Sequence, residues 1–203
     1  TYTHDAADRR KAMIDPDGGR FSYTWDAAGR QTRIINPQGK RTSLNYDAAG
    51  RQVQQAHGNS SLTTHLYDAA GQVTRLTNAN NLGVGFNRFT HTYDNAGNKT
   101  RVVESSGDVV TWTYDETYQL TRERRSGAAG YDVTHTYDPA GNRLVLTDSG
   151  TRTTHTYDAA NQLNLAQTGA NRTTYTHDAA GQRTKKESPS ETTFYEWDAR
   201  HKM

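Results

Sequence analysis

The sequence contains no cysteine and few aliphatic residues. Of its 203 residues, 10 are Leu, 3 Ile, 9 Val and 4 Phe, or 26 in all. This is about 13% of the chain, below the ~20% that folded domains usually exceed. The absence of cysteine excludes disulfides, thiolate nucleophiles and thiolate metal ligands. A conventional aliphatic core is therefore not expected.

The sequence also lacks an excess of either charge and any long apolar run. Its 24 Lys+Arg and 22 Asp+Glu leave a formal net charge of +2. This balance provides no basic stripe for a phosphate backbone and no self-repulsion typical of a disordered tail. No run approaches the ~18 apolar residues of a membrane helix. Nucleic acid and a membrane span are therefore not predicted as partners.

The first residues lack the features of a translation start or an export signal. The chain opens with Thr1-Tyr2-Thr3-His4, without an initiator Met, a basic segment or an apolar segment. We expect it to be a segment of a longer polypeptide, with any export signal outside it.

An internal repeat organises the whole sequence. An aromatic residue or His followed by Asp occurs ten times, with the Asp residues 20 to 26 positions apart. The ten Asp residues are Asp5, Asp26, Asp47, Asp68, Asp94, Asp115, Asp138, Asp158, Asp178 and Asp198. Since they span the chain, we predict one repeat array over residues 1–203, with no second domain.

Each Asp begins a turn motif, Asp-x-x-Gly. The Asp can accept hydrogen bonds from backbone N–H groups, and the Gly can adopt positive φ. The predicted turn pairs are Asp26 and Gly29, Asp47 and Gly50, Asp68 and Gly71, Asp94 and Gly97, Asp138 and Gly141, and Asp178 and Gly181. Asp8, Tyr118, Asn161 and His201 replace the Gly. Because Tyr poorly tolerates positive φ, we expect a distorted turn around Asp115.

A second turn signal lies halfway along each period, as in Asp15-Pro16-Asp17-Gly18. Two turns per period leave segments of about seven residues, which is strand length. The longest periods have their extra residues at this second turn, from Asn78 to Arg88 and from Ser126 to Tyr131. We predict an all-β fold, a repetitive antiparallel meander of about twenty short strands that curls as a strip or spiral.

Aromatic residues and His occupy the positions one and three before each Asp, called here −1 and −3. These positions share one face of a strand because side chains alternate. The predicted aromatic ladder comprises Tyr23, Trp25, Tyr46, Tyr67, Tyr93, Trp112, Tyr114, Tyr137, Tyr157, Tyr175, Tyr195 and Trp197. Its rings are expected to provide most of the burial that aliphatic residues provide elsewhere.

The strand that follows each Gly turn has a second alternation. Positions +6 and +8 after the Asp are moderately apolar, as in Thr32 and Ile34, whereas +5 and +7 are often charged, as in Lys99 and Arg101. Because Arg outnumbers Lys by 18 to 6, we expect arginines on a solvated face opposite the apolar one.

Metal and catalytic readings of these residues are weaker than structural ones. The ten Asp residues lie in repeats two strands apart, too far for shared Ca²⁺ ligands at 2.3–2.6 Å. The six His residues of the −1 and −3 positions occupy the same places as Tyr and Trp, which favours a packing role over a metal or acid–base site. No nucleophile completes a Ser-His-Asp set. We therefore predict no cofactor, no metal and no enzymatic activity.

A ligand-binding reading of the ladder stays open beside the structural one. Tyr and Trp rings in a row suit sugar rings, so an exposed ladder could bind a polysaccharide. However, a ladder given over to a ligand would leave too little apolar burial to stabilise 203 residues.

The motif resembles the Rhs/YD repeat, written DPxGxxxxYxYDxxGR. The unit from Ile14 to Arg30 and the next, with Asn36-Pro37-Gln38-Gly39 and Asn45-Tyr46-Asp47, carry the resemblance. Ten copies in phase over nearly the whole chain make the signal specific. His and Trp in the Tyr position, and the four missing Gly residues, are departures.

The resemblance implies a function that the repeat period alone does not. Rhs proteins, the B/C components of bacterial toxin complexes and teneurins wind such repeats into a hollow shell. In the bacterial members the shell holds a C-terminal toxin, released after autoproteolysis in a core region with a DPxGL-type signature. Nothing here matches that core, since Gly19 follows Asp15-Pro16-Asp17-Gly18, so no catalytic residue can be assigned.

Partners and localisation follow from the same resemblance. The implied partners are the remaining repeats and an enclosed C-terminal cargo, and the implied location is outside the bacterial cell or on its surface. Unpaired strands at the two ends predict end-to-end self-association. The alternative function is a surface adhesion module that binds glycan or protein through the aromatic ladder.

Overall fold

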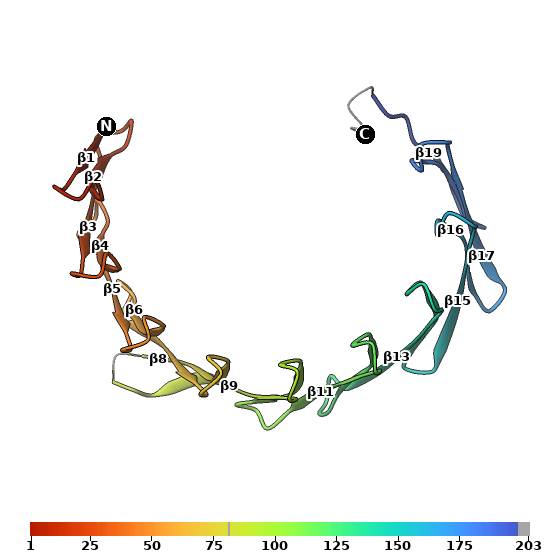
Figure 1. The fold of residues 1–203 in the computed structure, drawn as a ribbon, viewed down its shortest axis with the longest axis horizontal. Helices are drawn as coiled ribbons and strands as arrows, with labels where there is room; N and C mark the ends of the chain where they lie inside the picture. The colour runs from red at the N-terminus through yellow and green to blue at the C-terminus, as the bar shows by residue number, and fades with distance from the viewer. Residues whose placement is uncertain (81, 199–203) are drawn as a thin grey trace. The chain divides into compact units, whose positions relative to one another are not determined.

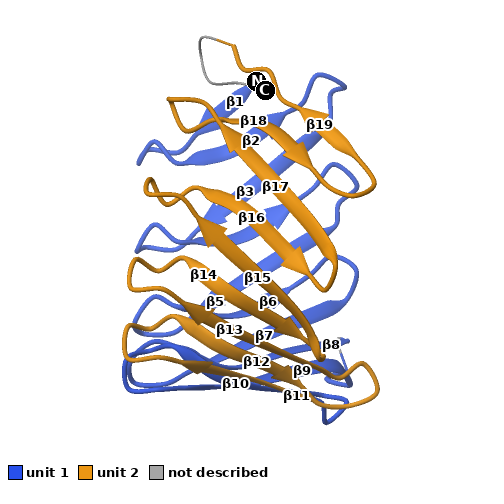
Figure 2. Cartoon of the chain, turned by 90° about the vertical axis from the view of Figure 1, so that its right-hand side faces the viewer, with its two compact units in different colours: residues 1–108 blue, residues 109–203 orange. Residues whose placement is uncertain are grey.

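A computed structural model describes residues 1–80 and 82–198, so the predicted turn residue His201 lies outside the described residues. The chain divides into two compact units, Thr1–Asp108 and Val109–Met203 (Figure 2). The described residues form nineteen strands and no helix. The predicted all-β antiparallel meander is confirmed.

The first unit contains strands β1 to β10, and each strand pairs antiparallel with the next in chain order (Figure 1). The strands are β1 (Tyr2–His4), β2 (Arg10–Ile14), β3 (Arg20–Trp25), β4 (Gln31–Ile35), β5 (Arg41–Tyr46), β6 (Gln52–Ala56), β7 (Ser61–Tyr67), β8 (Val73–Asn80), β9 (Gly85–Tyr93) and β10 (Lys99–Glu104). The extra residues of the longest period lengthen the β8–β9 hairpin.

The second unit repeats this arrangement with strands β11 to β19. The strands are β11 (Val109–Tyr114), β12 (Leu120–Arg125), β13 (Tyr131–Tyr137), β14 (Arg143–Asp148), β15 (Thr151–Tyr157), β16 (Leu163–Thr168), β17 (Asn171–His177), β18 (Arg183–Glu187) and β19 (Thr192–Phe194). In both units the odd-numbered strands from β1 to β17 end at position −1, immediately before the motif Asp.

The Asp turns are three-residue hairpin loops of one kind. In the loop after β3, the Asp26 N–H donates to the Arg30 carbonyl at 2.9 Å, and the Gly29 N–H donates to the Asp26 carbonyl at 3.0 Å. Gly29 has φ +78°. A turn closed by a left-handed residue is a common three-residue hairpin connection, and Gly avoids the Cβ clash there.

The turns without Gly keep the same geometry. Asp8, Tyr118 and Asn161 have φ of 59°, 64° and 60°. The Tyr118 N–H donates to the Asp115 carbonyl at 3.0 Å, as Gly29 does to Asp26. The expected distortion around Asp115 is therefore wrong: the tyrosine adopts the left-handed conformation, and the hydrogen bonds of the turn hold it there.

A β-bulge precedes the Asp turns and changes which residues share a face. Trp25 lies opposite Gln31 while Thr24 lies opposite Arg33, so Thr32 is the extra residue. The bulge interrupts simple alternation and brings position +5 opposite the −1 aromatic. The Arg10 guanidinium, at position +5, accordingly lies 4.7 Å from the Tyr2 ring centroid.

This bulge corrects the predicted location of the arginines. Arg183, also at position +5, lies 4.8 Å from the Tyr175 ring centroid and 5.9 Å from that of Tyr195. Arg10 and Arg183, both at position +5, therefore belong to the aromatic face, whereas Arg101 at position +7 is exposed, as predicted. Alternation counted from the Gly turn misplaced the +5 arginines because it took no account of the extra residue.

Full burial is confined to a few small or mid-sized side chains. Among the described residues these are Ala12, Ala79, Val102, Val110 and His155, each with 3–8% of its surface exposed. The Tyr and Trp residues at position −1 are half-buried, whereas Tyr2, at position −3 in the first strand, is exposed. The fold thus depends on hydrogen bonds and half-buried rings more than on a closed core.

Candidate functional site

Strand pairing between neighbouring repeats stops short of the Asp turns. β4 and β5 pair at Ile35 with Arg41, Ile34 with Thr42 and Arg33 with Ser43. The pairing goes no further, although β4 begins at Gln31 and β5 continues to Tyr46. The Gln31 carbonyl is left without a strand partner, and a polar side chain must satisfy it if it is to be shielded from water.

The −1 aromatic residue of the next repeat satisfies this carbonyl. The Tyr46 hydroxyl donates to the Gln31 carbonyl at 2.7 Å. The same bond, from position −1 to the +5 carbonyl of the preceding repeat, recurs in both units. Its other examples are Trp25 to Arg10, Tyr67 to Gln52, Tyr93 to Val73, Tyr137 to Leu120, Tyr157 to Arg143 and Trp197 to Arg183, at 2.7–3.0 Å.

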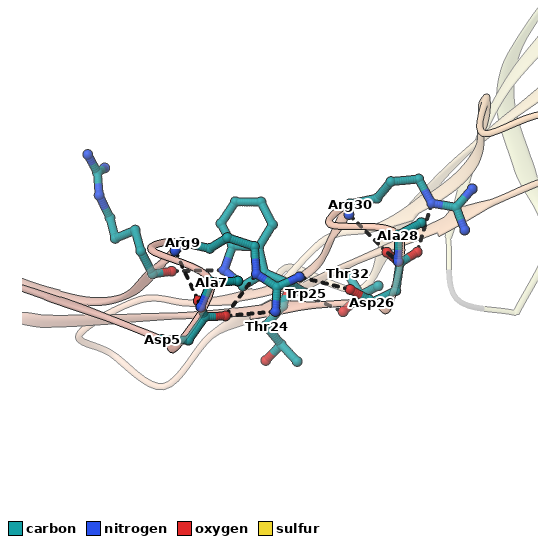
Figure 3. A network of polar contacts seen from close by, with 10 residues as sticks. Asp5, Ala7, Arg9, Thr24, Trp25, Asp26, Ala28, Arg30 and Thr32 are labelled. Atoms are coloured by element: carbon teal, nitrogen blue, oxygen red, sulfur yellow. Dashed lines mark hydrogen bonds and ion pairs between the residues drawn. The ribbon is translucent and has the colours of Figure 1, made fainter.

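The residue four positions after the Asp forms a second link between repeats. Asp26 Oδ2 accepts from Arg30 Nε at 2.7 Å, and Asp26 Oδ1 accepts from the Arg30 N–H at 2.9 Å. Arg30 Nη1 then donates to the Asp47 carbonyl in the next turn at 3.3 Å. Arg9 reaches Asp26 in the same way at 3.0 Å (Figure 3).

These guanidinium groups also lie over the aromatic rings. The Arg30 guanidinium lies 4.9 Å from the Tyr46 centroid, and that of Arg51 lies 4.6 Å from the Tyr67 centroid. Such contacts combine cation–π attraction with the planar hydrogen-bonding geometry of Arg. We call the motif Asp, its +4 residue and the −1 aromatic of the next repeat the Asp-edge clamp.

The later repeats carry an amide at position +4, which is Gln72, Asn98, Gln119, Asn142, Gln162 or Gln182. The side chains of Asn98 and Asn142 donate to the motif Asp, at 3.0 and 2.9 Å. Asn142 Nδ2 also donates to Asn161 Oδ1 in the next turn at 2.9 Å. These two amides retain the side-chain hydrogen bond to the Asp but contribute no charge and no cation–π contact.

The clamp keeps its carboxylates ionised. Hydrogen bonds from the +4 residue hold the pKa of Asp5, Asp26, Asp47, Asp94, Asp115 and Asp138 below the usual value for aspartate. In each case the largest contribution is a backbone or side-chain hydrogen bond from that residue. A lowered pKa marks the carboxylates as structural acceptors and not as proton donors near neutral pH.

Four repeats have a histidine at position −3 whose ring nitrogen Nδ1 is buried. His65, His91, His135 and His155 each have a buried Nδ1 without a hydrogen-bond partner. Burial lowers the pKa of His91, His135 and His155, and the nearby Lys99 or Arg143 charge lowers it further. In the described part of the chain, no three His, Asp or Glu side chains gather as a metal site.

The structure brings some of the predicted residues together and separates others. The +4 arginine of one turn lies over the −1 ring of the next repeat, as Arg30 does over Tyr46, whereas among the described residues no stacked pair joins the rings of successive repeats. The ring pairs of this face are His65 with Tyr67 and His135 with Tyr137, each within one strand at 6.2–6.3 Å between centroids.

Position +4 is the functional residue that the sequence reasoning overlooked. Arg, Gln or Asn follows the Asp by four residues in nine repeats, which was a visible signal. The predicted solvated face concerned positions +5 and +7, and no role was predicted for position +4, because nothing local indicates that its side chain reaches the next turn.

Comparisons with known proteins agree with the repeat. The RHS Repeat family model matches residues 25–62 and, overlapping, residues 46–82. This supports the Rhs/YD resemblance drawn from the motif. A search of curated proteins finds no match.

Several solved structures share the fold. They include the crystal structure of TcdB2-TccC3-Cdc42, 15% identical with a TM-score of 0.67, covering 98% of this chain and 16% of that one. TcdB2-TccC3 without the hypervariable C-terminal region gives 15% identity and a TM-score of 0.66, with the same two coverages. A Photorhabdus luminescens Tc holotoxin pore with a TccC3 mutation gives 16% identity and a TM-score of 0.63, covering 91% of this chain and 13% of that one.

Proposed function

Because the chain is built of Rhs/YD repeats, we propose that it forms part of the wall of a β-sheet shell, and that the shell encloses a C-terminal polypeptide cargo outside the bacterial cell. The observation that carries this proposal is the Asp-edge clamp. At seven junctions between repeats the −1 ring donates to the +5 carbonyl of the preceding repeat, and at three of them Arg9, Arg30 or Arg51 also donates to the next Asp carbonyl. Such a clamp suits a continuous wall, where every repeat needs contacts only with its neighbours.

The chemistry of the clamp suits containment. At the Asp edge, backbone pairing between repeats is interrupted, and an interruption would expose carbonyls to water and to other strands. Tyr and Trp donors and the +4 side chains occupy these openings, as Tyr46 and Arg30 do between β4 and β5. The wall thereby stays closed to pairing with a cargo chain along its length.

Fold similarity supports the same proposal. The chain matches part of TcdB2-TccC3 over nearly its full length, and it spans about one sixth of that protein. A wall segment is the role that agrees with such partial coverage. The enclosed cargo and the location outside the cell are part of the proposal and not of this fold similarity.

A binding role for the aromatic ladder is the less favoured alternative. The ring of Tyr67 is already covered by a guanidinium, and its hydroxyl is already bonded to a carbonyl. A sugar would have to displace these contacts before it could lie on the ring.

The shell can be tested on the intact polypeptide that contains this chain. We expect electron cryomicroscopy to reveal a hollow particle, and limited proteolysis to leave the segment inside it undigested until the wall is unfolded. An open strip, or a C-terminal segment digested as fast as a free peptide, would refute the shell. A glycan array should show no saturable binding, whereas binding abolished by Tyr67→Ala would favour adhesion.

A further inference from the structure

The first unit carries three unpaired arginines on adjacent strands. Arg75 of β8, Arg88 of β9 and Arg101 of β10 are exposed, and none of them makes a hydrogen bond or ion pair with the described residues. Arg9, Arg30 and Arg51 of the same unit differ, because they are bound to the motif Asp.

Strand register places the three arginines on one face. Arg75 lies opposite Thr90, and Arg88 lies opposite Thr77, the next residue on the same face of β8. Arg101 lies opposite Thr92, so the arginines surround Thr90 and Thr92 of the central strand. With strands about 4.8 Å apart, the guanidinium groups can reach one extended ligand.

This face contains no compensating carboxylate. The only acidic residue in β8, β9 and β10 is Glu104. It lies opposite Phe89, on the other face of β10 from Arg101. Three guanidinium groups without a partner form a local positive surface on a chain whose net charge is only +2.

Exposed apolar side chains lie close to these arginines along the chain. Leu82, Val84 and Phe86 are exposed by 82%, 63% and 60%, and Phe86 lies two residues before Arg88 in β9. A hollow of ≈ 330 Å³ lies beside Arg75 and Arg88, with Gly85 and Ser105 also in its lining. Arg and aromatic residues together are typical of the centres of protein interfaces.

From these observations we propose that this face of β8, β9 and β10, together with Val84 and Phe86, is a docking surface for an acidic polypeptide segment that also carries apolar side chains. Carboxylates of the segment pair with Arg75, Arg88 and Arg101, and its apolar side chains contact Phe86 and Val84. Guanidinium and carboxylate form two parallel hydrogen bonds, which favours this pairing over a diffuse attraction. The proposal does not depend on the shell.

The exposed side chains of Val84 and Phe86 favour a polypeptide ligand over a polyanion. A sulfated polysaccharide or a nucleic acid backbone would use the arginines but would leave Phe86 and its neighbours in water. A chain of mixed acidic and apolar residues satisfies both sets of side chains.

The test is fluorescence anisotropy with the whole 203-residue chain and a labelled peptide of alternating Glu and Leu. We expect saturable binding that Arg75→Gln, Arg88→Gln and Arg101→Gln together weaken by about tenfold or more. The matched control removes three other exposed arginines, Arg20→Gln, Arg152→Gln and Arg172→Gln, and should change affinity by less than about twofold. Thermal unfolding verifies that both triple variants fold.

Two further probes separate the contributions. Phe86→Ser should weaken the Glu–Leu peptide but leave an alternating Glu–Gly peptide unaffected. Equal losses in the two triple variants, or tighter binding of heparin that Phe86→Ser does not alter, would overturn the proposal in favour of non-specific charge or a polyanion. Absence of saturable peptide binding would also overturn it.

Discussion

The hydroxyl of the −1 tyrosine has an unusual partner, a backbone carbonyl that strand pairing leaves free. Tyr46 and the Gln31 carbonyl illustrate the consequence. Water can replace a lost hydroxyl at an exposed site, but a half-buried carbonyl without a donor retains its desolvation cost. The contribution of each clamp should therefore be measurable one residue at a time.

Tyr46→Phe should lower the free energy of unfolding by about 1 kcal/mol, because it removes the donor and keeps the ring. Tyr118→Phe is the matched control, since Tyr118 is 62% exposed, and should change it by less than about 0.5 kcal/mol. Urea unfolding of both variants provides the comparison. Equal effects would mean that the Tyr46 hydroxyl adds nothing to stability.

Tyr118→Gly should stabilise the protein by about 0.5–1 kcal/mol. The left-handed conformation at φ 64° costs a tyrosine about 1–2 kcal/mol. Gly removes this cost, but its extra freedom in the unfolded chain offsets part of the stabilisation. Asn161→Gly, at φ 60°, should gain less because Asn tolerates this region. Thermal unfolding can rank the two variants, and a destabilised Tyr118→Gly would contradict the strain argument.

At the scale of the element, the sequence was sufficient to predict the strands and turns but not the β-bulge. Asp26 and Gly29 fix a turn because their preferences are local. The register between Thr24 and Trp25 depends on the opposite strand, so no pattern within one strand reveals the extra Thr32. The position of Arg10 could not be predicted for the same reason, and that of Arg30 could not be predicted because its partner, the Asp47 carbonyl, belongs to the next repeat.

In the first unit, the turn that contains Gly58 lies very close to the turn that contains Lys40. A Cβ on Gly58 would lie 2.7 Å from Lys40 Cβ and 3.2 Å from the Arg41 backbone nitrogen. Gly58→Ala should therefore destabilise the protein by about 1–3 kcal/mol, since backbone atoms must move. Gly85→Ala is the control, because its nearest atom would be 3.8 Å away, and it should be neutral or slightly stabilising. Chemical denaturation distinguishes them; a neutral Gly58→Ala would show that the turns separate freely.

At the scale of the whole molecule, acid should act in two ranges of pH. The lowered pKa of His91, His135 and His155 means that the unfolded chain takes up protons first, so stability falls as pH drops below about 6.5. The lowered pKa of Asp26 and its equivalents adds stability above about pH 4, which is lost as pH falls through the folded-state value.

The two ranges can be separated by mutation. His135→Gln with His155→Gln should flatten the decline in melting temperature between pH 7 and about pH 5 and leave the acidic decline in place. Asp26→Asn with Asp47→Asn should do the reverse, at the cost of lower stability at neutral pH. If the melting temperature of the histidine variant declined as steeply with pH as that of the original protein, the histidines at position −3 would not titrate in this range.

The acceptors of the clamp have a consequence for sequence divergence. A main-chain carbonyl is present whatever the residue, so position +5 can be Arg, Gln, Val or Leu and still receive the same donor, as Arg10, Gln31, Val73 and Leu120 do. Substitution there requires no compensating change in a neighbouring repeat. The clamp therefore fixes the residue type at only a few positions in each period. This agrees with the similar fold of chains that are only 15% identical.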